Sequence, residues 1–159
     1  MTTVPLWVYK CNARNPPPGV VVADWEQFFR EGRREWGSTQ AIRSAVSLRV
    51  LREEMAEGDL VLAIQTDRRA AMGLCRVAEF DDYRGADGRW ERDVILESLR
   101  RFHPPVRLYE LKKAQRALTQ VKALQQGPVQ TLYATTPREA RILLEACGVE
   151  PGMLIRGRS

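Results

Sequence analysis

Two apolar runs separated by a polar tip occupy the centre of the chain. Residues 60–64 are almost wholly apolar, residues 65–69 are polar, and residues 70–80 are again rich in apolar and β-favouring types. This pattern predicts a β-hairpin. An apolar strand without polar alternation is usually covered on both faces, so we expect the hairpin in the middle of the domain, entered through a turn at Gly58.

The first third of the chain mixes extended and helical patterns. Residues 6–12 alternate Trp, Val and Tyr with other types, which predicts the first strand. Asp24 fits a helix N-cap for a short helix that ends at Gly32. Residues 33–38 are interpreted as a charged loop that carries one large aromatic ring. Apolar spacing close to the helical period predicts one or two helices over residues 39–57.

The same criteria divide the second half into shorter pieces. They predict a polar loop over residues 81–89, a strand over 90–99, an extended step over 106–108, a helix over 112–126 and a strand over 129–134.

The clearest helix start lies at Thr136. Threonine can cap the helix, Pro137 suits its first turn, and Glu139 completes a capping box. Strands near both ends of the sequence, a central hairpin and interspersed helices indicate the α+β class. At this length we expect one domain over residues 1–150, followed by a loosely ordered tail over residues 151–159.

Several short motifs occur in a fixed order between residues 6 and 147. They are LWVYK at residues 6–10, Trp36-Gly37, Gly58-Asp59 with the hairpin behind it, and PVRL at residues 105–108. In this order they resemble the EVE family, a branch of the PUA-like modified-base readers that is related to YTH and ASCH domains. The resemblance implies that the strands curl into a small PUA-like β-barrel flanked by helices.

The charge balance favours an anionic partner. The chain has 25 Lys and Arg against 20 Asp and Glu, a net charge of +5. Nearly all the positive charge is arginine, whose guanidinium fork suits phosphate oxygens; a GC-rich genome would also replace lysine by arginine. We expect a soluble cytoplasmic protein, because no signal peptide or membrane-spanning run is evident.

Catalytic and metal-binding patterns are scarce. The single histidine, His103, has no evident partner, and the three cysteines are far apart and outside any CxxC spacing. No sequence motif of a known hydrolase or nucleotide-binding loop occurs. We therefore expect no catalytic residues, no metal, no cofactor and a binding function.

Reading a base outside its stack requires an aromatic surface, polar groups for the base edge and cations for the flanking phosphates. Trp36 is the first candidate for stacking, since the resemblance places its loop at the base cage; its alternative role is a loop anchor folded onto the core. Trp7 and Trp25 lie on periodic apolar faces and are expected in the core. Tyr83 and Trp90 are candidate second walls or structural residues.

Polar side chains for the base edge are expected at three places. They are Lys10, Cys11 and Asn12 at the end of the first strand, Ser38 after Trp36, and Gln65 and Thr66 at the hairpin tip. Amide side chains offer both a donor and an acceptor, as a nucleobase edge requires. The alternative for Asn12 and Gln65 is hydrogen bonding within turns.

Five arginines in predicted loops are candidates for phosphate contacts. They are Arg33, Arg34, Arg68, Arg69 and Arg84. Each of them alone would be an ordinary solvated charge, and only their common position around the predicted pocket makes them a set.

These observations favour a non-enzymatic reader that captures a flipped modified base, a modified cytosine or adenine in DNA. A nuclease or a modification system is a candidate protein partner. The alternatives are an RNA-binding PUA- or ASCH-like module that acts on tRNA or structured RNA, a small enzyme of nucleotide metabolism, and a pocket for a small metabolite.

Overall fold

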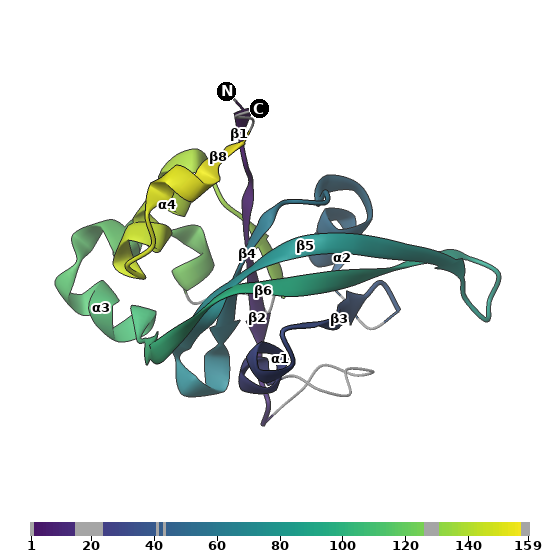
Figure 1. The fold of residues 1–159 in the computed structure, drawn as a ribbon, viewed down its shortest axis with the longest axis horizontal. Coiled ribbons are helices and arrows are strands. Elements are labelled where there is room, and N and C mark those ends of the chain that lie inside the picture. Colours follow the sequence, from purple (N-terminus) through teal and green to yellow (C-terminus); the bar gives the residue numbers. More distant parts are fainter. Residues whose placement is uncertain (1, 15–23, 41, 43, 126–130, 157–159) are drawn as a thin grey trace.

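One mixed β-sheet forms the centre of the molecule. The computed structural model describes residues 2–14, 24–40, 42, 44–125 and 131–156 (Figure 1). The strands are β2 (Leu6–Cys11), β3 (Arg33–Ser38), β4 (Leu60–Gln65), β5 (Ala70–Arg84), β6 (Trp90–Val106) and β7 (Leu132–Ala134). Their order in the sheet is β3-β6-β5-β4-β2-β7, and only β2 and β4 pair in parallel.

The predicted central hairpin is confirmed. All six residues of β4 are buried, and β4 lies between β5 and β2 near the middle of the sheet. Gly58 enters the hairpin with φ of 89°, a left-handed conformation in which glycine avoids the steric cost of a side chain. The fully apolar strand therefore lies where its pattern indicated, covered on both faces.

Four α-helices accompany the sheet in the described residues. They are α1 (Trp25–Glu31), α2 (Ala45–Arg49), α3 (Leu108–Ala114) and α4 (Pro137–Ala146). Figure 1 shows α3 and α4 together at the left end of the sheet, and α2 on the right. Over the described parts of the chain, no helix has both the length and the apolar character that a membrane crossing demands.

Helix starts and stops follow the predicted local signals. The Asp24 side chain accepts a hydrogen bond from the Glu26 amide, and Gly32 ends α1 in the left-handed conformation. Thr136 and Glu139 form the reciprocal capping box at the start of α4. These caps satisfy backbone donors that the first helical turn leaves unpaired, which explains why a local pattern locates them.

Other segments differ from the sequence-based expectations. Residues 33–38 form an edge strand instead of a loop, and much of the predicted loop at 81–89 belongs to the long strands β5 and β6. The helix expected over 112–126 is instead the C-terminal part of α3 followed by two 3₁₀ turns, Arg116–Gln120 and Lys122–Leu124.

The 3₁₀ turns have a simple cause in the spacing of apolar residues. Leu118, Val121 and Leu124 are all fully buried and recur at intervals of three. A 3₁₀-helix has three residues per turn, so this spacing places the three side chains on one face, whereas an α-helix would rotate them apart.

The C-terminal segment is partly held in place. Residues Pro151–Leu154 form a 3₁₀ turn, and β8 (Ile155–Arg156) pairs antiparallel with β1 (Thr2–Thr3). This differs from the loose tail expected over 151–159. Residues 126, 129–130 and 157–159, which the predictions included, lie outside the described residues.

The predicted closure into a small β-barrel is wrong for the described strands. The sheet is open, with β3 at one edge and β7 at the other. Next to the edge of β7 lies α2, where the buried Ser47 Oγ accepts hydrogen bonds from the amides of Thr131 at 3.2 Å and Leu132 at 3.1 Å. A helix side chain thus satisfies backbone donors of the edge segment, as a neighbouring strand would do.

This contact predicts that Ser47→Ala destabilises the protein. The substitution removes the buried hydroxyl that accepts from both amides, so we expect a loss of about 1–3 kcal/mol in the free energy of unfolding, measured by urea denaturation. Thr119→Ala, at an exposed position, is the control and should change it by less than about 0.5 kcal/mol. Equal effects of the two substitutions would contradict the role assigned to Ser47.

Candidate functional site

Trp36 is a buried strand residue, which corrects the expectation of a ring held out of the core. Its side chain is 5% exposed, and its ring centre lies 4.7 Å from that of Trp25 and 5.4 Å from that of Phe28. The indole Nε1 donates to the Sγ of Cys11 at 3.3 Å. A base could stack on this ring only if covering side chains moved.

Cys11 and the hairpin-tip residues serve the local structure. The Gln65 amide accepts a hydrogen bond from the Trp25 backbone at 2.8 Å and donates to Asp67 at 2.7 Å. Thr66 donates to the backbone carbonyl of Cys11. Burial raises the pKa of the Cys11 thiol to about 12, so it stays protonated at neutral pH. These contacts join the ends of β2 and β4 to the start of α1.

Asn12 and Lys10 point to different environments. The Asn12 side chain accepts from the Arg14 amide at 2.9 Å, the turn hydrogen bond named as its alternative. Lys10 lies on the face of β2 opposite to Cys11, with its Nζ 4.4 Å from the ring centre of Tyr133. Burial and the nearby charge of Lys112 lower the pKa of Lys10 to about 8.

Ser38 and Tyr83 are brought together, as one shared site requires. Their hydroxyl oxygens are 3.3 Å apart, and the Tyr83 hydroxyl donates to Asp93 at 3.0 Å. Burial and the neighbouring Asp93 raise the pKa of the Glu35 carboxyl. These four side chains, Glu35, Ser38, Tyr83 and Asp93, form a polar cluster where β3, β5 and β6 lie side by side.

Tyr83 and Trp90 cannot form two walls of one cage. Tyr83 pairs with Glu91 and Arg84 pairs with Trp90 across the β5–β6 ladder, and successive residues of a strand point to opposite faces. Trp90 is 61% exposed, and the Arg84 guanidinium lies 4.7 Å from its ring centre. This ring and its cation are therefore free to contact a partner on the opposite face from the polar cluster.

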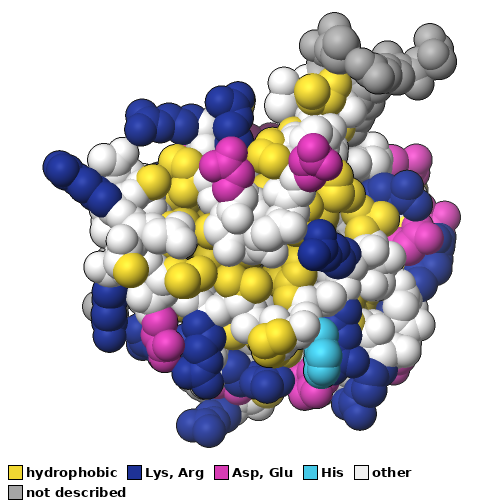
Figure 2. All heavy atoms as spheres, turned by 60° about the vertical axis from the view of Figure 1, so that its left-hand side comes forward, with side chains coloured by type: hydrophobic (Ala, Val, Ile, Leu, Met, Phe, Trp, Pro, Cys, Tyr) yellow, Lys and Arg dark blue, Asp and Glu magenta, His cyan; other side chains and the backbone are white. Residues whose placement is uncertain are grey.

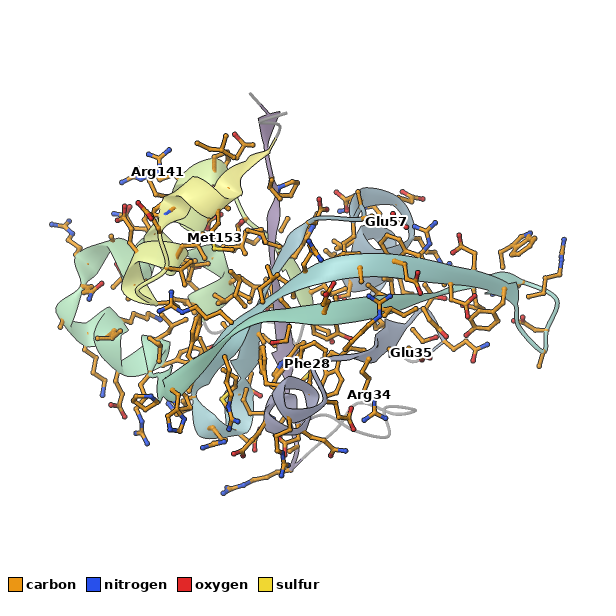
Figure 3. All side chains as sticks on the ribbon, in the orientation of Figure 1. Phe28, Arg34, Glu35, Glu57, Arg141 and Met153 are labelled. Atoms are coloured by element: carbon orange, nitrogen blue, oxygen red, sulfur yellow. The ribbon has the colours of Figure 1, made fainter. Side chains whose placement is uncertain are left out.

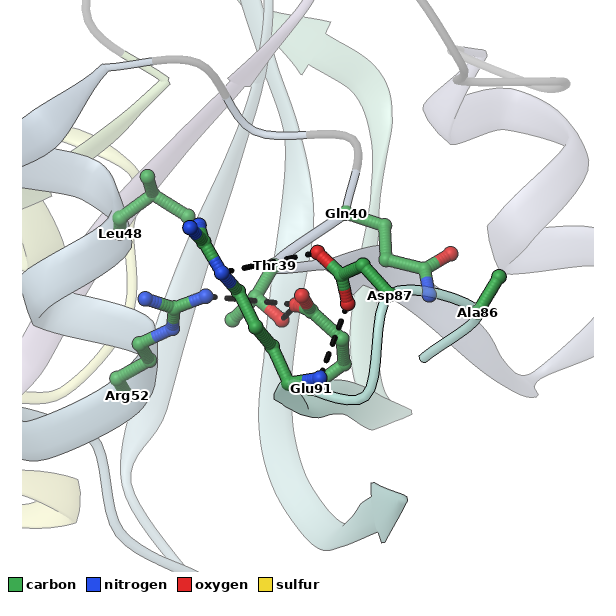
Figure 4. A pocket seen from close by; sticks show the side chains of 8 residues that line it. Thr39, Gln40, Leu48, Arg52, Ala86, Asp87 and Glu91 are labelled. Atoms are coloured by element: carbon green, nitrogen blue, oxygen red, sulfur yellow. Dashed lines mark hydrogen bonds and ion pairs between the residues drawn. The ribbon is translucent and has the colours of Figure 1, made fainter. Parts of the chain in front are cut away.

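Beside the polar cluster around Tyr83 and Asp93 the structure contains a cavity of about 620 Å³, which we call the hairpin pocket (Figure 4). It lies between the end of β3, the tip of the β5–β6 hairpin and the helical segment that contains α2. Its lining residues are Thr39, Gln40, Leu48, Arg52, Ala86, Asp87, Arg89 and Glu91.

A buried carboxylate organises one wall of the hairpin pocket. Glu91 is 8% exposed, accepts a hydrogen bond from the Thr39 hydroxyl and lies 3.4 Å from the Arg52 guanidinium. Arg89 and Asp87 form an exposed ion pair at 3.7 Å. The pocket thus presents guanidinium planes, carboxylates and one uncharged amide, that of Gln40.

None of the residues predicted from sequence lines this pocket directly. Its walls come from three segments that lie up to about fifty positions apart, so no local pattern reveals them. The nearest available signal was the Trp36-Gly37-Ser38 motif, since Thr39 and Gln40 follow it directly.

The predicted phosphate-contact arginines are mostly occupied. Arg33, Arg34 and Arg68 each pair with a glutamate, while Arg69 and Arg84 lie over aromatic rings. Exposed ion pairs contribute only about 0–1 kcal/mol, so a phosphate could replace the glutamate partners at little cost.

Groups suited to metal binding or nucleophilic chemistry are not gathered in the described structure. In residues 2–14, 24–40, 42, 44–125 and 131–156, no group of three or more His, Cys, Asp or Glu side chains could hold a metal ion. Cys11, Cys75 and Cys147 are buried free thiols, and His103 is exposed on β6.

Comparison with solved structures identifies the fold. No protein-family model matches the chain, and neither does any curated protein sequence. The human THYN1 protein in complex with 5-methylcytosine-containing DNA matches with a TM-score of 0.68 at 16% identity, over 92% of this chain and 99% of that one. The chain shares the fold of that protein, as the EVE-like resemblance of its motifs predicts.

Two further solved structures share this fold. The DUF55 domain of human thymocyte nuclear protein 1 matches with a TM-score of 0.67 at 16% identity, over 91% of this chain and 99% of that one. A protein from Pseudomonas putida matches with a TM-score of 0.67 at 17% identity, over 89% and 99%. The resemblance inferred from short motifs is thus confirmed at the level of the fold.

The two tryptophans offer a direct test of the site geometry. Trp36→Ala should lower the free energy of unfolding by about 3–5 kcal/mol, because it opens a cavity beside Trp25 and Phe28. Trp90→Ala removes a ring that is 61% exposed and should change it by about 0.5 kcal/mol or less. Urea denaturation measures both, and a loss below about 1 kcal/mol for Trp36→Ala would contradict its packing.

The polar cluster predicts a pH-dependent effect of Glu35. A carboxyl whose pKa is raised on folding opposes folding above its unfolded pKa of about 4.3, and this penalty vanishes below that pH. Glu35→Gln should therefore raise the melting temperature at pH 7 by about 1–2 °C, an effect reduced by solvent screening, and leave it unchanged near pH 3.5. Exposed Glu53→Gln is the control; the same shift there would refute the coupling to Asp93.

Proposed function

We propose that the protein is a non-enzymatic nucleic-acid reader that captures a flipped modified base, a modified cytosine or adenine in DNA. The main support is the shared fold, because the THYN1 structure that matches over 92% of this chain holds 5-methylcytosine-containing DNA. The net charge of +5 is in keeping with a polyanionic partner.

The hairpin pocket has the size and chemistry that base recognition needs. A volume of about 620 Å³ falls within the range of ordinary ligand pockets. The guanidinium planes of Arg52 and Arg89 can stack on a base, and the carboxylates can accept from an exocyclic amino group of cytosine or adenine. Gln40 supplies both a donor and an acceptor for the base edge.

Trp36 takes a supporting part in this proposal. Its ring anchors β3 between α1 and Cys11, and the residues that follow it, Thr39 and Gln40, reach the pocket. A fixed strand end holds the Gln40 backbone in place before the base arrives, which lowers the entropic cost of binding.

Trp90 would act outside the pocket. Its exposed ring, next to Arg84, can stack on a neighbouring nucleotide, an interaction of about 1–3 kcal/mol that does not depend on base identity. The proposal thus separates discrimination, assigned to the pocket, from general affinity, assigned to the rings and cations around it.

The test compares DNA duplexes that carry methylated cytosine or methylated adenine with unmodified duplexes of the same sequence, by fluorescence titration. The wild-type protein should prefer one modified duplex by roughly 5- to 150-fold, which corresponds to about 1–3 kcal/mol. The double substitution Gln40→Ala and Arg89→Ala should abolish this preference. Trp90→Ala should weaken binding to both duplexes by the same factor.

Two outcomes would count against the reader function. Equal affinity of the wild-type protein for modified and unmodified DNA would remove it. Tighter binding to structured RNA of matching sequence would instead favour the RNA-binding alternative, since the 2′-hydroxyl distinguishes the two nucleic acids.

A further inference from the structure

The excess positive charge of the chain lies in one segment. Residues 98–125 contain seven Lys and Arg against a single acidic residue, Glu110. The rest of the chain holds the other 18 basic and 19 acidic residues, and is therefore close to neutral. This segment runs from the second half of β6 through α3 into the 3₁₀ turns behind it.

The fold brings further cations to α3 from distant parts of the chain. Arg69, at the tip between β4 and β5, places its guanidinium 5.3 Å from the ring centre of Tyr109 in α3. Lys10 on β2 is close enough to Lys112 for that charge to lower its pKa. We call this region the α3 surface; its residues are Lys10, Arg69, Lys112, Lys113 and Arg116.

Among the described residues, these cations have no acidic partners at ion-pair distance. Within the described part of the chain, none of the five forms an ion pair with a carboxylate within 4.0 Å, and the Lys112 ammonium instead donates to the Leu124 carbonyl at 3.0 Å. Arg33, Arg34 and Arg68, by contrast, are all paired. Figure 2 looks toward this end of the molecule and shows Lys and Arg side chains around its left and lower edges, with a few Asp and Glu side chains among them.

The backbone of Arg69 also has an unusual conformation. It is a non-glycine residue with φ of 52°, held by a hydrogen bond from its amide to the Thr66 carbonyl. Such a conformation is unfavourable for a side chain of this kind. The turn therefore fixes a guanidinium beside α3 at a conformational cost.

We infer that the α3 surface binds the phosphate backbone of the nucleic acid, independently of base identity and away from the hairpin pocket. This rests on the proposed function only in taking nucleic acid as the partner. In Figure 1 α3 and the tip of the β5–β6 hairpin lie at opposite ends of the long sheet. The α3 surface and the hairpin pocket would therefore contact different parts of one strand or duplex. Backbone contacts of this kind set affinity and register and carry no sequence information.

An anionic membrane is the other polyanion that such a surface could meet, and the structure favours nucleic acid. Membrane-surface segments combine basic residues with exposed large apolar side chains that enter the lipid. Of the described residues, the exposed large apolar ones are Val46, Trp90, Leu99, Met153 and Ile155, and none belongs to α3 or to the turns behind it.

The test measures how duplex affinity depends on salt concentration. The variant Arg69→Gln, Lys113→Gln, Arg116→Gln changes three exposed side chains. Each lost phosphate contact should reduce the slope of log affinity against log salt by about 0.9, so the variant should lose about 2.7 in slope. Its affinity for unmodified duplex at physiological salt should fall on the order of 100-fold.

The matched control removes the same charge elsewhere. Arg30→Gln, Arg49→Gln, Arg76→Gln lowers the net charge by the same amount at exposed positions of α1, α2 and β5. It should keep most of the wild-type slope. The charge-retaining variant Arg69→Lys, Lys113→Arg, Arg116→Lys should also keep it, which separates loss of charge from loss of folding.

The outcomes distinguish this inference from the reader function. Equal slopes for the α3 variant and the matched control would overturn the α3 surface, even if modified DNA is still preferred. Loss of salt-sensitive binding only in the α3 variant would support it, even if modified and unmodified duplexes bind equally. Binding to vesicles of phosphatidylserine and phosphatidylcholine without binding to DNA would also overturn it.

Discussion

The structure depends on complete burial of the central strand β4. It pairs with β2 on one side and β5 on the other, and two separate hydrophobic clusters pack against the two faces of this sheet. Asp59 sets the start of the strand, because its buried carboxylate accepts from the indole of Trp7 at 2.9 Å and from the Ala56 amide at 2.8 Å. Because β4 has no exposed face, side chains that contact a partner must lie at the periphery of the sheet.

The periphery has two ends of different character. The strands β5 and β6, of 15 and 17 residues, extend beyond the six-residue strands β2 and β4. Their overhanging part lies beside β3 and the segment of α2, where the hairpin pocket forms, and it leaves Trp90 exposed (Figure 3 shows the side chains there). At the other end, α3 and α4 cover the sheet, and the cations of the α3 surface gather there from β2, the β4–β5 tip, α3 and the turn behind it.

Ion pairing divides the arginines into two groups with different uses. Near β3 and α1, guanidinium groups lie against glutamates, which holds them in place and reduces the local field. In the described structure the five cations of the α3 surface form no ion pair with a carboxylate, so salt is what screens their field. The net charge of the sequence does not distinguish these two groups, because pairing depends on which side chains the fold places together.

The sequence by itself determined the features that depend on a few neighbouring residues. These are the central hairpin, the turn at Gly58, the caps at Asp24 and Thr136, and the motif order that resembles the EVE family. Only the tertiary structure decided that Trp36 is buried, that the sheet stays open beside Ser47, and that the pocket forms at Glu91. Each of these outcomes rests on contacts between residues about ten to eighty-five positions apart, and no local periodicity records which distant side chain will cover a given ring.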